Sequence, residues 1–300
     1  MHPTPSALVR PWFPVNNLWS LGGLSWRELI LRTWHETWED AVFGQAARLA
    51  FYHFLAIFPC LLLMFFLISR FPTAETRLHT NLVASLKLLL PEQSSALMES
   101  MIAQLKDTAH TGMAAWSAAV GALWAAVNGT WAVMTGLNTA YEVKEERPLW
   151  KVVPIAFTLS VSLAILFLIA LSLVVYGRRL WPGLALPWIA LPVLAVLLLA
   201  GLALFYRFGP NLDDRRWQWS TPGAALALVL WLLAAGLMRL YSANFHSYAV
   251  IYKQLNGAAT LLLWFYFTSA AVLIGGEMNS EIEKAVRART GHSPARREGR

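Results

Sequence analysis

The chain has 300 residues, of which 57% are hydrophobic and only 14% are charged, and its mean hydropathy is +0.49. Soluble globular proteins carry about 25% charged residues, so a soluble enzyme or a disordered chain does not fit, and one cysteine (Cys60) cannot form an intramolecular disulfide. The net charge of +7 is expected from the cytoplasmic Lys and Arg residues of a membrane protein, so it does not indicate a nucleic-acid partner.

The N-terminal region divides into an irregular cytoplasmic arm (1–24) and an amphipathic helix (25–45). Ser25 and Glu28 have the spacing of a capping box, which predicts the start of this helix. Trp26, Ile30 and Trp34 then recur at helical spacing. Two placements fit this pattern: a helix in the lipid headgroup region with its tryptophans toward lipid, or a helix packed on the cytoplasmic ends of the spans.

The remainder predicts an all-α polytopic membrane domain (46–283) followed by a basic cytoplasmic tail (284–300). A transmembrane helix needs about 20 mainly apolar residues. Residues 70–111 have helical periodicity but no run of that length, so they predict a helical outer segment between the first two spans. The six predicted spans are residues 46–68, 112–137, 152–176, 184–206, 222–241 and 257–275.

The distribution of basic residues predicts the orientation. An even number of spans puts both termini on one side, and sixteen of the 24 Lys and Arg residues then lie on that side. Because cytoplasmic loops carry the excess of Lys and Arg, we expect both termini in the cytoplasm.

The sequence contains none of the common catalytic motifs. HExxH, GxSxG, P-loop and GxGxxG patterns and paired cysteines are all missing, and the seven histidines are scattered. We therefore expect no enzymatic activity, no cofactor, no metal site and no nucleic-acid partner.

Polar residues near the inner ends of the predicted spans are the first candidate site, because polar groups at membrane depth are costly and often functional. We hypothesise that Glu277 pairs with Arg48 or Arg207. The alternative is an interhelical clamp without a transport function. The candidate cluster consists of Arg48, Tyr52, Asn138, Arg207, Glu277 and Asn279.

The connection between the fifth and sixth spans is the second candidate. It is polar and rich in aromatic residues, which is typical either of a solvated loop or of an outer gate or headgroup contact. The residues concerned are His246, Tyr248, Tyr252 and Lys253.

Several ordered motifs over about 46–285 resemble the YihY/virulence factor BrkB family, once labelled ribonuclease BN-like. The resemblance implies a six-span bacterial inner-membrane protein, with suggested links to envelope integrity and to movement of lipid or lipopolysaccharide precursors. The chain departs from the family pattern at Arg48, Ala56, His246 and Lys253. The matching motifs are Leu49-Ala50-Phe51-Tyr52 with Phe58-Pro59, Leu137-Asn138-Thr139, Tyr206-Arg207-Phe208-Gly209-Pro210, Pro222-Gly223-Ala224, the aromatic spacing from Tyr241 to Tyr252, Trp264, and Leu273-Ile274-Gly275-Gly276-Glu277-Met278-Asn279.

We therefore predict a transport-like protein that handles a lipidic or amphiphilic envelope substrate, with membrane lipids as partners. A non-transporting scaffold that contacts envelope proteins or a second copy of the chain is the main alternative, and a ribonuclease is the third reading.

Overall fold

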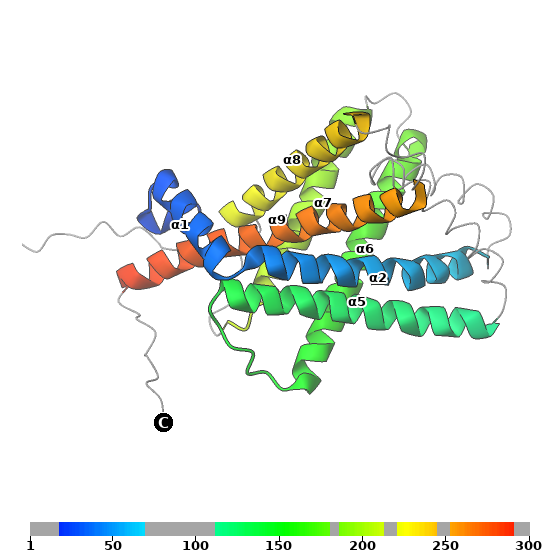
Figure 1. Cartoon of the computed structure of the whole chain (residues 1–300), viewed down its shortest axis with the longest axis horizontal. Helices are drawn as coiled ribbons and strands as arrows, with labels where there is room; N and C mark the ends of the chain where they lie inside the picture. The colour runs from blue at the N-terminus through cyan, green and yellow to red at the C-terminus, as the bar shows by residue number, and fades with distance from the viewer. Residues whose placement is uncertain (1–17, 70–111, 181–185, 213–220, 245–252, 291–300) are drawn as a thin grey trace, which may run out of the picture.

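The computed structural model describes residues 18–69, 112–180, 186–212, 221–244 and 253–290, and within these ranges every element is a helix (Figure 1). The all-α fold class is confirmed. The predicted outer segment (70–111) and His246, Tyr248 and Tyr252 lie outside the described residues. The elements are a 3-10 helix η1 (Leu18–Gly23) and the α-helices α1 (Trp26–Glu39), α2 (Val42–Ser69), α5 (Gly112–Ala140), α6 (Leu149–Leu180), α7 (Leu186–Phe208), α8 (Pro222–Asn244) and α9 (Lys253–Thr290).

Each predicted span overlaps one of the helices α2 and α5 to α9. Within the described ranges, three segments are long and apolar enough to cross a membrane: Leu149–Ala170, Pro222–Leu240 and Gly257–Arg289. The segment Pro192–Phe208 of α7 is apolar but shorter. The chain is therefore a polytopic membrane protein, and the number of six crossings stays a prediction.

The predicted helix 25–45 is two helices. The Ser25 hydroxyl caps α1 by accepting a hydrogen bond from the Glu28 amide (3.2 Å), as expected, while the Glu28 carboxylate pairs with Arg32 (2.7 Å). The chain then turns at Ala41, whose φ of 48° lies in the left-handed region that breaks a right-handed helix. As a result α2 begins at Val42, four residues before the predicted start of the span.

The main core lies where α2, α5, α7, α8 and α9 meet. Leu49, Leu137 and Leu273 are fully buried there, and the Tyr206 hydroxyl donates a hydrogen bond to the Val272 carbonyl oxygen (2.8 Å), joining α7 to α9. In contrast, α6 and α8 expose many large apolar side chains, which suits helices surrounded by lipid.

Glycines let α8 and α9 approach very closely. A Cβ atom at Gly223 would overlap the carbonyl oxygen of Gly275, and a Cβ at Gly275 would overlap the Tyr206 hydroxyl. Close backbone contact of this kind is typical of small residues at membrane helix interfaces.

α9 is longer than the predicted sixth span at both ends. Its first residue is Lys253, which the sequence placed in the outer connection, and it continues through 284–290 of the predicted basic tail. Pairing of Arg287 with Glu283 (3.5 Å) stabilises this extension. In Figure 1 the C-terminal part of α9 lies beside α1 at one end of the bundle.

Candidate functional site

An acidic cluster lies at the end of the bundle that holds α1, which we name the inner end. It forms where α1, the turn before α2, the end of α5 and the extension of α9 meet. We define the acidic cluster as Glu36, Asp40, Glu142, Glu277 and Glu281, with Lys284 among them.

Lys284 bridges three elements of this cluster. Its Nζ atom lies 2.6 Å from Glu142 Oε1, 2.8 Å from Glu281 Oε1 and 3.7 Å from Glu36 Oε1. One ammonium group thus faces more carboxylates than it can neutralise. Among the described residues, no group of three or more His, Cys, Asp or Glu side chains has the arrangement of a metal site.

Glu277 and Asp40 are the two members that this lysine does not bind. Glu277 is 1% exposed, and neither of its carboxylate oxygens has a hydrogen-bond donor; Asp40 Oδ2 is likewise buried without a donor. The two side chains interact with each other. Because two ionised carboxylates offer only acceptors, a stable contact between them requires a proton on one of them.

Electrostatics in the cluster work against ionisation of the carboxyl groups on α1. Burial raises the pKa of Asp40, and the neighbouring Glu142 and Glu39 raise it further, although Lys284 and the contact with Glu277 oppose the shift. Burial likewise raises the pKa of Glu36, and Lys284 again opposes the shift. The cluster therefore favours a bound proton more than isolated carboxylates do.

The hypothesis that Glu277 pairs with an arginine is wrong. Neither carboxylate oxygen of Glu277 has a hydrogen-bond partner in the described part of the chain, so neither Arg48 nor Arg207 pairs with it directly. Arg48 is exposed on α2, whereas the adjacent Leu49 is buried. Arg207 ends α7 with its guanidinium over the Phe208 ring (6.0 Å), and its Nε and Nη1 atoms have no hydrogen-bond partner.

Two predicted site residues act as clamps between elements. Asn279 accepts a hydrogen bond from the Gly223 amide (3.0 Å) and donates to the Thr221 hydroxyl (2.9 Å), and that hydroxyl caps α8. Asn138 accepts a hydrogen bond from the Asn211 amide (2.7 Å). Both asparagines are buried and paired.

Asn138 also donates a hydrogen bond to Glu145 Oε2 (2.8 Å), and Glu145 binds Arg147 through both carboxylate oxygens. Arg147 in turn donates to the Gly209 carbonyl oxygen (3.0 Å), so this network ties the loop after α5 to the end of α7. Burial alone would raise the pKa of Glu145, but the hydrogen bonds from Arg147 and Asn138 lower it below its usual value.

Tyr52 belongs to neither network. It is half-buried against the core, with its ring at 6.0 Å from that of Phe51. The six predicted cluster residues thus separate into one buried acid, two clamps and three residues elsewhere.

Sequence reasoning missed every member of the cluster except Glu277, namely Glu36, Asp40, Glu142, Glu281 and Lys284. Spacing alone places Glu277, Glu281 and Lys284 on one face of a helix, because residues three and four apart are neighbours. It places Glu36 and Asp40 on one face of another helix in the same way. No local signal shows that these two faces meet, since that contact depends on the turn at Ala41.

A bundle of apolar helices with buried ionic groups at one end defines a polytopic helical membrane protein. The sequence profile of the Virulence factor BrkB family matches residues 33–300, and the chain belongs to this family.

Its relatives include membrane proteins from several bacteria. The ribonuclease-like protein YfkH of Bacillus subtilis is 26% identical over 258 residues, which is 80% of this chain and 90% of that protein. A UPF0761 membrane protein of Xanthomonas campestris is 25% identical over 274 residues; the match covers 88% of this chain but only 60% of that protein. A UPF0761 membrane protein of Tolumonas auensis is 36% identical over 87 residues, 29% of this chain and 28% of that protein. No solved structure matches the chain.

Proposed function

We propose that this protein has a transport-like role, in which an amphiphilic or lipidic envelope substrate moves along the helices and Glu277 takes up and releases a proton. The supporting observation is that Glu277 is buried with both carboxylate oxygens free of any donor. Ionisable groups in this setting are costly, and in membrane proteins they mark proton, ion or substrate pathways.

The surroundings of Glu277 support a proton as the ion. Asp40 interacts with it, and a pair of carboxyl groups holds one proton more readily than two ionised groups coexist. Lys284 is engaged by Glu142 and Glu281, so it is not available as a direct partner. No catalytic role is part of this proposal.

The test is the movement of a fluorescent phosphatidylglycerol across proteoliposomes that contain the full chain. We expect faster movement than in empty vesicles, and a loss on the order of tenfold for Glu277→Gln, which corresponds to about 1.4 kcal/mol in the barrier. Glu146→Gln, which removes an exposed carboxylate from the loop after α5, is the control and should leave the rate unchanged.

Equal rates with and without the protein would remove the transport proposal. Movement that Glu277→Gln leaves intact would keep transport and remove the role of Glu277.

A scaffold for envelope proteins or for a second copy of the chain is the second candidate. It is favoured by the backbone contact between Gly223 and Gly275, which suits a bundle that holds one arrangement. A scaffold would not move lipid. It would co-purify from the native membrane with a defined partner or as a dimer.

A further inference from the structure

The α1 helix has three distinct faces. Leu29, Thr33 and Thr37 are buried, and through this face the helix packs on α9. A second face carries the charged side chains Glu28, Arg32, His35 and Glu39, all of them exposed.

The third face is apolar and exposed. Trp34 is 56% exposed and Trp38 60%, and Ile30 and Leu31 lie on the same side of the helix. The docked face of α1 therefore consists of one leucine and two threonines, while the larger tryptophans point outward. We name Ile30, Leu31, Trp34 and Trp38 the tryptophan band.

The tryptophan band continues onto α2. The rings of Trp34 and Trp38 lie 5.7 Å apart, and Trp38 contacts Phe43 at the start of α2 at 5.0 Å. Below Phe43, the exposed side of α2 carries Phe51 and Leu55, at helical spacing. One apolar surface thus runs from α1 to the outward face of a predicted span.

Arg48 lies on this same exposed side of α2. In the described part of the chain it has no hydrogen-bond or ion-pair partner. It lies within two turns of the start of α2, where a long arginine side chain reaches the headgroup layer while its stem stays on the apolar surface. A guanidinium group in that position matches the geometry and charge of a phosphate.

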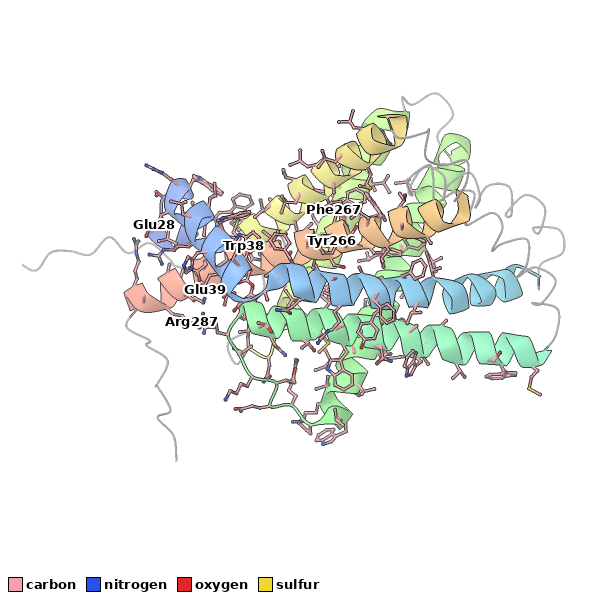
Figure 2. The ribbon with its side chains drawn as sticks, in the orientation of Figure 1. Glu28, Trp38, Glu39, Tyr266, Phe267 and Arg287 are labelled. Carbon is pink, nitrogen blue, oxygen red and sulfur yellow. The ribbon has the colours of Figure 1, made fainter. Side chains whose placement is uncertain are left out.

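We propose that the tryptophan band lies in the interfacial layer of the inner leaflet, and that Arg48 binds the phosphate of a phospholipid headgroup beside it. Tryptophan is enriched at this depth because its ring is amphipathic. The charged face of α1 is then directed toward water. Figure 2 shows Glu28, Trp38 and Glu39 on α1, with Arg287 at the adjoining end of α9. This surface would bind lipid whether or not the protein transports anything.

The first test compares neighbouring positions on α1 by nitroxide labelling in phosphatidylcholine–phosphatidylglycerol liposomes. Single cysteines replace Trp34, His35, Trp38 and Glu39 in the full chain, in a Cys60→Ser background; all four side chains are exposed, so the changes should not disturb the core. The ratio of the collision rate with oxygen to the collision rate with a water-soluble nickel complex should be high at positions 34 and 38. It should be low at the control positions 35 and 39.

Two outcomes would overturn the proposal. Equal access of nickel at all four positions would place the tryptophan band in water. Protection of 34 and 38 from both oxygen and nickel would mean that a protein surface covers the band.

The second test concerns Arg48. Addition of phosphatidylglycerol to the detergent-purified protein should raise its unfolding temperature, and Arg48→Gln should reduce that increase. Arg32→Gln removes the same charge from the charged face of α1 and should keep the increase. An equal increase in both variants would exclude Arg48 as the phosphate ligand.

Discussion

Asp40 occupies an unfavourable position for an ionised side chain, because it is partly buried and lies near the carboxylates of Glu142 and Glu39. Its pKa is raised above the ordinary value of 3.8, first by burial and then by Glu142 and Glu39. A carboxyl group whose pKa is higher in the folded state stabilises the fold most below its unfolded pKa. This contribution is lost as the pH rises through the folded pKa.

Asp40→Asn should therefore raise the unfolding temperature at about pH 7.5 and change it little at about pH 3, where the native side chain binds a proton in either state. The new amide also offers Glu277 the donor that it lacks. Thermal unfolding in one detergent at both pH values measures the effect. Glu146→Gln, an exposed carboxylate in the loop after α5 that is not among the groups acting on Asp40, is the control. A destabilised Asp40→Asn at the higher pH would contradict this account.

The residues of the candidate site were predictable only in part. Glu277 stands out in the sequence as an acid close to an apolar run, and the structure does bury it. The partners of Glu277 could not be predicted. The predicted pair with Arg48 required Arg48 to point into the bundle, and in the structure it is exposed. The rotation of α2, which turns Leu49 inward and Arg48 outward, is fixed by tertiary packing that a sequence pattern does not display.

At the scale of elements, α8 and α9 are in close backbone contact. Gly223→Ala or Gly275→Ala would insert a methyl group into space filled by backbone or by the Tyr206 hydroxyl. Overpacking of this kind costs about 1–3 kcal/mol, so both variants should unfold at lower temperature.

Gly236→Ala is the matched control, because it lies on α8 with nothing within 4 Å of the new Cβ. It should be neutral or stabilising by up to about 1 kcal/mol, since alanine is the better helix former. If Gly236→Ala and Gly223→Ala lowered the unfolding temperature equally, the contact with α9 would not be the cause.

The helices themselves were the most predictable feature. Long apolar runs specify helices in a membrane, because every backbone polar group must be satisfied within the segment. The break between α1 and α2 was not predictable, since the left-handed position is occupied by Ala41 and not by the glycine that usually signals such a turn. That single turn moves Asp40 next to Glu277.

For the whole molecule, the asymmetry of Lys and Arg residues predicts that the inner end faces the cytoplasm. Single cysteines at Ser6, Gly183 and Ser293 in a Cys60→Ser background test this orientation. In spheroplasts, an impermeant maleimide should label the variant at 183 and should label those at 6 and 293 only after permeabilisation. Labelling of either terminus in intact spheroplasts would contradict the predicted topology.

α9 has 38 residues and, at roughly 1.5 Å per residue, a length of about 57 Å. The hydrocarbon layer is only about 30 Å thick, so this one rod extends well beyond it and carries Lys284 on its projecting part. The ion pairs of Lys284 with Glu142 and Glu281 then form outside the hydrocarbon, where charged groups are far less costly than at its centre.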